Sequence, residues 1–173
     1  MKKAPKNTFT AVLEKFDSHL LYYYFLVPNE IATVFVSEKS KRVVCIINDS
    51  EKIQCALMHK KGGGFFINVN KKTRDKLKLN SSSEINVQLT KDDSKYGLPM
   101  PEELAELLKL DDEGNELFHS LTPGKQRTLL HIIGLPKGMD IRIRRAIAIL
   151  NHLKENNGKI DYKMMNEAMK NKL

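Results

Sequence analysis

The period of the apolar residues changes once along this chain, close to Gly97. Before that point, apolar and polar residues alternate over short runs, which is typical of half-buried β-strands. After it, apolar residues recur every three or four positions, which is typical of amphipathic helices. We therefore expect an α+β chain in which residues 1–96 form a small β-barrel domain and residues 97–173 form a helical segment packed on that domain.

The region before Gly97 contains a repeated pattern. Strands are predicted at residues 9–13, 20–27, 42–47, 52–59, 65–69 and 84–89, with short helices at 28–35 and 71–77. The order strand, polar break, helical turn, strand occurs at 25–31 and again at 67–73, 42 residues later. Two such halves, related by a pseudo-twofold axis, predict a closed six- or seven-stranded barrel of the double-split kind. Chance similarity between short elements is the alternative.

A hairpin is predicted where residues 42–47 and 52–59 flank a cluster of turn-forming residues. Pairing Ile47 with Ile53 places Cys45 opposite Cys55 on an apolar face that should point inward. We interpret the two cysteines as small buried side chains rather than a disulfide or a metal site, because a zinc site needs four ligands and only His59 is nearby.

The helices are predicted from their start signals. Pro101 begins one, Thr122 caps the next with Pro123 at its first position, Asp140 caps a longer one and Asp161 caps the last. Residues 111–115 are expected to interrupt the first of these helices. The longest helix carries an expected buried stripe of Ile143, Ala146, Ile147, Leu150 and Leu153.

The net charge of +8 is divided unevenly along the chain. Residues 1–100 carry +7, residues 101–120 carry −6 and residues 121–173 carry +7. An acidic block between two basic ones can dock against either of them, whereas a free basic surface can attract nucleic acid or anionic lipid. No apolar run approaches the ~20 residues of a membrane-spanning helix, and the basic start leads into a strand rather than a secretion signal. A cytoplasmic location is expected.

The residue patterns of common catalytic and cofactor sites do not appear in this sequence. Gly62, Gly63 and Gly64 lack the following Lys-Ser/Thr of a phosphate loop, so a strand connection is the favoured interpretation. The five histidines are scattered, and no serine or cysteine lies in a nucleophile elbow. We therefore expect no catalytic residue, no metal and no cofactor.

A basic group in the helical part is the strongest candidate for ligand binding. Guanidinium groups suit carboxylate and phosphate partners, and Arg142 and Arg145 share one side of a helix while Arg144 lies round from them. The alternative is that these arginines pair with the acidic block or cap neighbouring carbonyls. The hypothetical binding set is Lys125, Arg127, Lys137, Arg142 and Arg145, together with Gly63 and Gly64 of the glycine connection.

Two groups of motifs resemble a known family. The first comprises residues 27–31, residues 62–67, Arg74, and Val87 with Leu89; the second comprises residues 101–104, Phe118, residues 121–127, and Lys137 followed by Arg142 and Arg145. Through these two groups of motifs, residues 9–160 resemble the bacterial YdeI/OmpD-associated (bacteriocin-protection) family. The resemblance is to members in which an N-terminal β domain of unknown function precedes the helical segment. The resemblance implies a small barrel, and protection against bacteriocins or cationic peptides. The chain departs from it in having no tryptophan and in having Ile141 where relatives have threonine.

The preferred functional hypothesis is a non-enzymatic binding module for an anionic small molecule, peptide or protein. Its ligand would bind near residues 62–66 and the arginines of the helix that begins at Asp140. A nucleic-acid-binding regulator is the alternative, because basic charge and paired strand-helix-strand halves occur in swapped-hairpin transcription factors. An enzyme with a site assembled from distant residues is a third reading.

Overall fold

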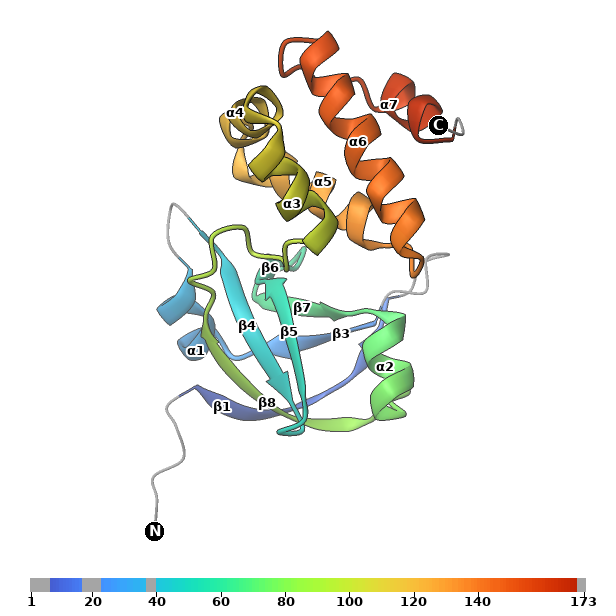
Figure 1. Cartoon of the computed structure of the whole chain (residues 1–173). Helices are drawn as coiled ribbons and strands as arrows, with labels where there is room; N and C mark the ends of the chain where they lie inside the picture. The colour runs from blue at the N-terminus through green and yellow to red at the C-terminus, as the bar shows by residue number, and fades with distance from the viewer. Residues whose placement is uncertain (1–6, 17–22, 37–39, 171–173) are drawn as a thin grey trace. The chain divides into compact units, whose positions relative to one another are not determined.

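The computed structural model describes residues 7–16, 23–36 and 40–170. The chain divides into two compact units, Met1–Asp93 and Ser94–Leu173, and each is described by itself. The first unit contains β-strands and two short helices, and the second contains helices (Figure 1). The expected α+β class is therefore confirmed, while the expected packing of the helices on the β domain stays a prediction.

Eight strands among the described residues of the first unit form two four-stranded antiparallel sheets. One sheet has the order β1-β8-β4-β5, with bounds Thr8–Val12, Glu84–Lys91, Arg42–Ile47 and Glu51–Ala56. The other has the order β2-β3-β7-β6, with bounds Glu14–Lys15, Tyr23–Val27, Phe65–Val69 and Met58–His59. The helices α1 (Asn29–Phe35) and α2 (Lys71–Leu77) follow β3 and β7.

The two sheets do not close into a barrel, so that part of the prediction was wrong. The chain bends at Leu13, between β1 and β2, and at Leu57, between β5 and β6. Before each bend the strand pairs only with the first sheet, and after it only with the second. Both leucines are fully buried in a core that the two sheets share. Each bend therefore joins the sheets covalently and leaves the strand edge before it unpaired.

The pairing register reveals an internal repeat. Adding 42 to the residue numbers of β3 gives β7, and the pair Tyr23–Val69 becomes Val27–Phe65. Adding 44 moves the bend at Leu13 to the bend at Leu57. The N–H of Leu13 donates to Ser83 O at 2.8 Å, and that of Leu57 donates to Lys41 O at 2.9 Å. The repeat first seen at 25–31 and 67–73 thus extends through the described strands of this unit.

The predicted hairpin is present, but its register differs by two residues. Ile47 pairs with Glu51 and Cys45 pairs with Ile53. The connection is shorter because Asn48 and Asp49 adopt left-handed backbone conformations, with φ of 50° and 52°. A shift of two residues keeps every side chain on its predicted face, so Cys45 is still fully buried.

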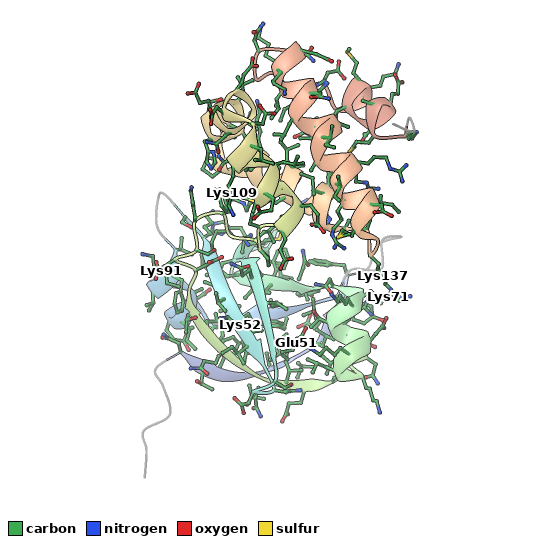
Figure 2. All side chains as sticks on the ribbon, in the orientation of Figure 1. Glu51, Lys52, Lys71, Lys91, Lys109 and Lys137 are labelled. Atoms are coloured by element: carbon green, nitrogen blue, oxygen red, sulfur yellow. The ribbon has the colours of Figure 1, made fainter. Side chains whose placement is uncertain are left out.

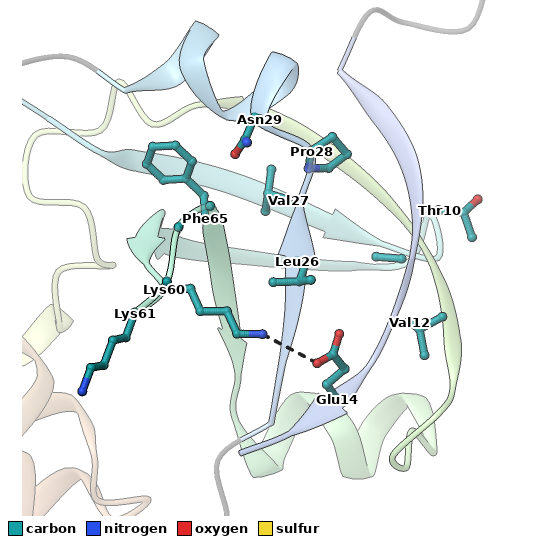
Figure 3. Close-up of a pocket in the computed structure, with 14 residues that line it drawn as sticks. Thr10, Val12, Glu14, Leu26, Val27, Pro28, Asn29, Lys60, Lys61 and Phe65 are labelled. Carbon is teal, nitrogen blue, oxygen red and sulfur yellow. Dashed lines mark ion pairs between the residues drawn. The ribbon is translucent and has the colours of Figure 1, made fainter. Parts of the chain in front are cut away.

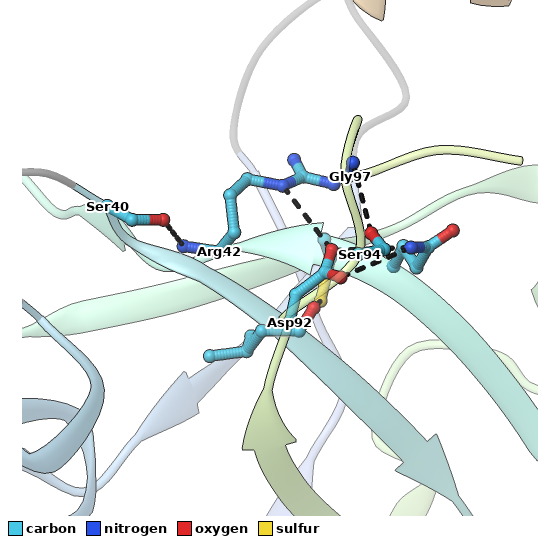
Figure 4. A network of polar contacts seen from close by, with 8 residues as sticks. Ser40, Arg42, Asp92, Ser94 and Gly97 are labelled. Carbon is cyan, nitrogen blue, oxygen red and sulfur yellow. Dashed lines mark hydrogen bonds and ion pairs between the residues drawn. The ribbon is translucent and has the colours of Figure 1, made fainter. Parts of the chain in front are cut away.

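The ends of β4, β5 and β8 are tied together by Asp92 (Figure 4). Its side chain is buried, with Oδ2 4.0 Å from Arg42 Nε, and both carboxylate oxygens accept from Gln54 Nε2 at 3.3 and 3.4 Å. Further along the chain, Gly97 N–H donates to Ser94 Oγ at 3.1 Å and forms a turn before the first helix of the second unit.

The second unit consists of α3 (Glu102–Leu110), α4 (Asp112–Ser120), α5 (Pro123–Gly134), α6 (Met139–Glu155) and α7 (Tyr162–Lys170). Thr122 caps α5 and Asp161 caps α7, as predicted. The predicted interruption at 111–115 is present but is only one residue long: α3 ends at Leu110, and the side chain of Asp111 caps α4, which begins at Asp112. The cap residue of α6 is Gly138, and Asp140 lies in its first turn.

The helices enclose a core of their own, separate from that of the sheets. The buried stripe of α6 is Ala146, Ile149, Leu150 and Leu153, while Ile143 and Ile147 are only half-buried. His152 is also buried, and its Nε2 accepts from Asp161 N–H at 3.1 Å, joining α6 to the cap of α7.

Candidate functional site

A groove of about 660 Å³ lies on the first unit, next to the unpaired edge of β1 (Figure 3). Its lining comes from three segments: residues 10–12 with Glu14, residues 26–29, and residues 60–65. The third segment is the connection between β6 and β7. The groove lies beside the bend at Leu13, where the chain passes from β1, which pairs with β8, into β2, which pairs with β3. The same bend that prevents barrel closure therefore creates this opening.

Two groove residues, Glu14 and Lys60, form a polar trio with the buried Tyr24. Tyr24 Oη donates to Glu14 Oε2 at 2.5 Å, and Lys60 Nζ donates to Tyr24 Oη at 3.0 Å. Lys60 Nζ also lies 4.0 Å from Glu14 Oε2, an ion pair drawn in Figure 3. The hydrogen bond with Tyr24, and then the nearby charge of Glu14, raise the pKa of Lys60 above its ordinary value. Lys60 therefore stays positively charged at neutral pH.

Apolar side chains lie close to the trio. Leu26 is 42% exposed and Val12 is 48% exposed, which is high for residues of their type in strands. Both are outward-facing members of alternating strands. On the same outer face as Leu26, the buried ring of Tyr24 stacks on Phe16 with centroids 4.1 Å apart. The groove thus presents positive charge and exposed apolar surface side by side.

The glycine connection forms a tight turn at the wall of the groove. Gly62, Gly63 and Gly64 have φ of 97°, 111° and 84°, a region that residues with a Cβ rarely adopt. Gly63 N–H donates to Lys60 O at 3.0 Å, and Lys60 N–H donates to Gly64 O at 3.1 Å. A Cβ on Gly63 would meet no atom within 4 Å, so backbone conformation rather than crowding requires glycine there. Gly63 and Gly64 both line the groove.

The comparisons with known proteins divide the chain at the same place as its compact units. Residues 9–89 match the family described as "Domain of unknown function (DUF1905)". Residues 98–156 match the family described as "Bacteriocin-protection, YdeI or OmpD-Associated", abbreviated OmdA. The chain carries a DUF1905 domain followed by an OmdA domain. No curated protein and no solved structure matches it.

In the OmdA domain, the two predicted arginines are held by contacts within the domain. Arg142 Nη2 and Nε lie 2.6 and 2.8 Å from Glu103 Oε1, and Arg142 Nη1 donates to the carbonyls of Pro136 and Lys137. Arg145 Nη1 donates to Ile132 O at 2.7 Å. The hydrogen bond from Arg142 holds the pKa of Glu103 below its ordinary value, and that bond also raises the pKa of Arg142. These arginines fasten α6 to α3 and α5.

The acidic block therefore pairs with the basic segment that follows it, as the first interpretation of the charge pattern predicted. A second ion pair of this kind joins Asp111 Oδ2 to Lys154 Nζ at 2.8 Å. Three other predicted binding residues lie on the surface: Lys125 is exposed in the first turn of α5, Arg127 is half-buried on α5, and Lys137 is exposed in the turn before α6. The carbonyl oxygen of Lys137 accepts a hydrogen bond from Arg142 Nη1 at 2.8 Å.

Exposed lysines are spread over both domains. Figure 2 labels Lys52, Lys71, Lys91, Lys109 and Lys137, which come from β5, α2, β8, α3 and the turn before α6. Scattered surface lysines of this kind are ordinary in proteins and do not mark a binding site. Lys60 and Lys61 differ because they lie together on a groove. Neither lysine was predicted from the sequence as a site residue, although two lysines directly before three glycines were a visible signal.

The part of the chain that the structure describes gives no sign of two other kinds of site. It holds no group of three or more histidine, cysteine or acidic side chains placed to bind a metal ion. None of its helices has the length and apolar character needed to cross a membrane.

Proposed function

We propose that this chain is a non-enzymatic binding module and that the groove of its DUF1905 domain is the ligand site. The observation that carries the proposal is that Lys60 lines the same groove as the exposed side chains of Leu26 and Val12. Such a surface suits a ligand with a negatively charged group next to an apolar one. The OmdA family is described as bacteriocin-protection, and this description supports a link between ligand binding in the groove and protection against bacteriocins.

The two lysines contribute differently to this binding. Lys60 already has Glu14 and Tyr24 as partners, so its charge is held in place before a ligand arrives. Lys61 is exposed at the start of the glycine turn, and its side chain extends away from Lys60 and Glu14 (Figure 3). It therefore adds positive potential at this end of the groove without lying beside Lys60. Together the two charges favour an anion over a cation there.

The test uses anilinonaphthalene sulfonate, a probe that combines an apolar ring system with a negative charge. The protein should bind it with increased fluorescence. Leu26→Glu should abolish that signal because it places a negative charge on the apolar wall, and Lys61→Glu should weaken it. Lys71→Glu is the matched control, because Lys71 is also exposed and lies outside the groove lining. Equal binding by Leu26→Glu, with its fold intact by circular dichroism, would refute the proposal.

The alternative of a nucleic-acid-binding regulator rests on the net charge of +8 and on the two repeated halves of the DUF1905 domain. It makes a different prediction, since binding to DNA should fall steeply as salt rises, by an amount set by the phosphates contacted. Arg142→Gln and Arg145→Gln should have little direct effect, because both side chains are engaged within the OmdA domain.

A further inference from the structure

We infer that the groove receives an extended peptide, which adds as a strand to the free edge of β1 and places an acidic group at the end of the groove that Lys60 lines. This inference rests on the proposed function and names its ligand class. It starts from the backbone of β1, which forms the outer strand of its sheet in the order β1-β8-β4-β5. An outer strand presents unpaired N–H and C=O groups that can bind another chain.

The hydrogen bonds of β1 show which of its backbone groups are open. Asn7 O accepts from Leu89 N–H at 3.0 Å, and Leu13 N–H donates to Ser83 O at 2.8 Å. Because alternate residues of an antiparallel strand face the same neighbour, residues 7, 9, 11 and 13 face β8. Thr8, Thr10 and Val12 therefore direct their backbone groups away from β8.

The open edge borders the groove. Thr10 and Val12 both line it, and no backbone hydrogen bond joins the described residues of β1 and β3. Thr10 and Val12 are two residues apart, so their outward backbone groups are spaced at about 6.8 Å, the distance between alternate residues along a strand. A small rigid anion would leave these groups unpaired, whereas an extended peptide supplies donors and acceptors at the same repeat.

The side chains along the groove specify the peptide further. In an added strand, alternate side chains point to one face, where the exposed Leu26 and Val12 favour apolar residues. At the end formed by the glycine turn, the ammonium group of Lys60 and the positive potential added by Lys61 favour a carboxylate. Charge complementarity therefore selects a peptide that combines apolar residues with acidic ones.

The probe is a short fluorescein-labelled peptide of alternating valine and glutamate, measured by fluorescence anisotropy with the full chain. One comparison peptide carries N-methyl groups on alternate amides along one edge, and a second has lysine in place of glutamate. Thr10→Pro removes the outward N–H of β1 without touching its ladder to β8, a change that outer strands tolerate. Thr10→Val is the matched control, because it loses the same hydroxyl contact with Asn86 but keeps the N–H.

Strand addition predicts that N-methylation and Thr10→Pro each weaken binding about fivefold or more, the effect of losing one hydrogen bond. Thr10→Val should bind the peptide like the natural protein. Lys52→Pro should do so as well, because it removes an N–H from the other outer strand, β5, at the position equivalent to Thr8 in the repeat. The lysine peptide should bind weakly. If Thr10→Pro fails to fold, the N-methylated peptide gives the same test on the natural protein.

Three results would overturn the inference. Equal affinity for the N-methylated and unmethylated peptides, with binding still lost in Leu26→Glu, would show a groove that does not add strands. Equal affinity for the lysine peptide would remove the acidic preference. Binding of anilinonaphthalene sulfonate without any binding of the valine-glutamate peptide would leave the proposed function intact and eliminate peptide recognition.

Discussion

Leu13 and Leu57 should make equal contributions to the stability of the DUF1905 domain. They occupy equivalent positions in the repeat, each at the bend that passes a strand from one sheet to the other. Both are fully buried. Truncation of such a leucine to alanine removes its transfer free energy and leaves a cavity, at a cost of about 3–4 kcal/mol. Because each bend is fixed by one buried side chain, we expect a value at the upper end of that range for both.

The assay is urea unfolding followed by backbone amide NMR, which separates the signals of the two domains. With a typical dependence on urea of about 2 kcal/mol per molar, each variant should lower the midpoint of the DUF1905 domain by about 1.5–2 M. Leu26→Ala is the control, because its side chain is 42% exposed and its loss should cost under about 1 kcal/mol. A loss below about 1 kcal/mol for Leu13→Ala, or losses at the two bends that differ more than twofold, would refute the symmetric account.

Further predictions concern the OmdA domain and the cysteines. Because Arg142 lowers the pKa of Glu103, the pair stabilises the fold at pH values above the ordinary pKa of glutamate. The natural protein should therefore be more stable than Arg142→Gln at neutral pH. Acid unfolding curves should show this difference in stability disappearing as pH falls through the lowered pKa. Gly114→Ala should destabilise α4 despite the helix propensity of alanine, because its Cβ would lie 2.7 Å from Asp111 Oδ2; in an Asp111→Ala background the same change should stabilise it by about 1 kcal/mol in thermal unfolding. Ellman's reagent should modify Cys55 in the folded protein and Cys45 only after unfolding, because a hydrogen bond with Cys55 and burial raise the pKa of Cys45; equal rates would contradict this.

Most of the secondary structure could be predicted because its signals are local. The strand at 42–47, the strand at 65–69 and the helices at 71–77 and 123–134 have the predicted bounds. Thr122 and Asp161 each cap the predicted helix, since a cap depends on the three residues that follow it. The register of the hairpin was less certain, because pairing Ile47 with Glu51 or with Ile53 buries the same face.

The missed features depend on residues far apart in sequence. The bend at Leu13 leaves the apolar alternation unchanged, so the pattern could not distinguish a closed barrel from two sheets joined at bends. The pairing of Arg142 with the acidic block was one of the two interpretations of the charge pattern, but Glu103 lies 39 residues away and helical periodicity does not identify it as the partner. The candidate site consequently moved from the arginines of the OmdA domain to the groove, where only Gly63 and Gly64 had been predicted.

The repeat also separates the residues that build the fold from those that line the groove. Buried positions keep their apolar character in both halves, as in Leu13 with Leu57 and Phe25 with Ile67. Two groove positions do not keep their character: the equivalents of Glu14 and Leu26 are Met58 and Asn68. Architecture alone would require only the first group to match. Because the other half has no carboxylate at the position of Glu14 and no apolar side chain at the position of Leu26, the chemistry of the opening beside β1 is a property of this groove rather than of the fold.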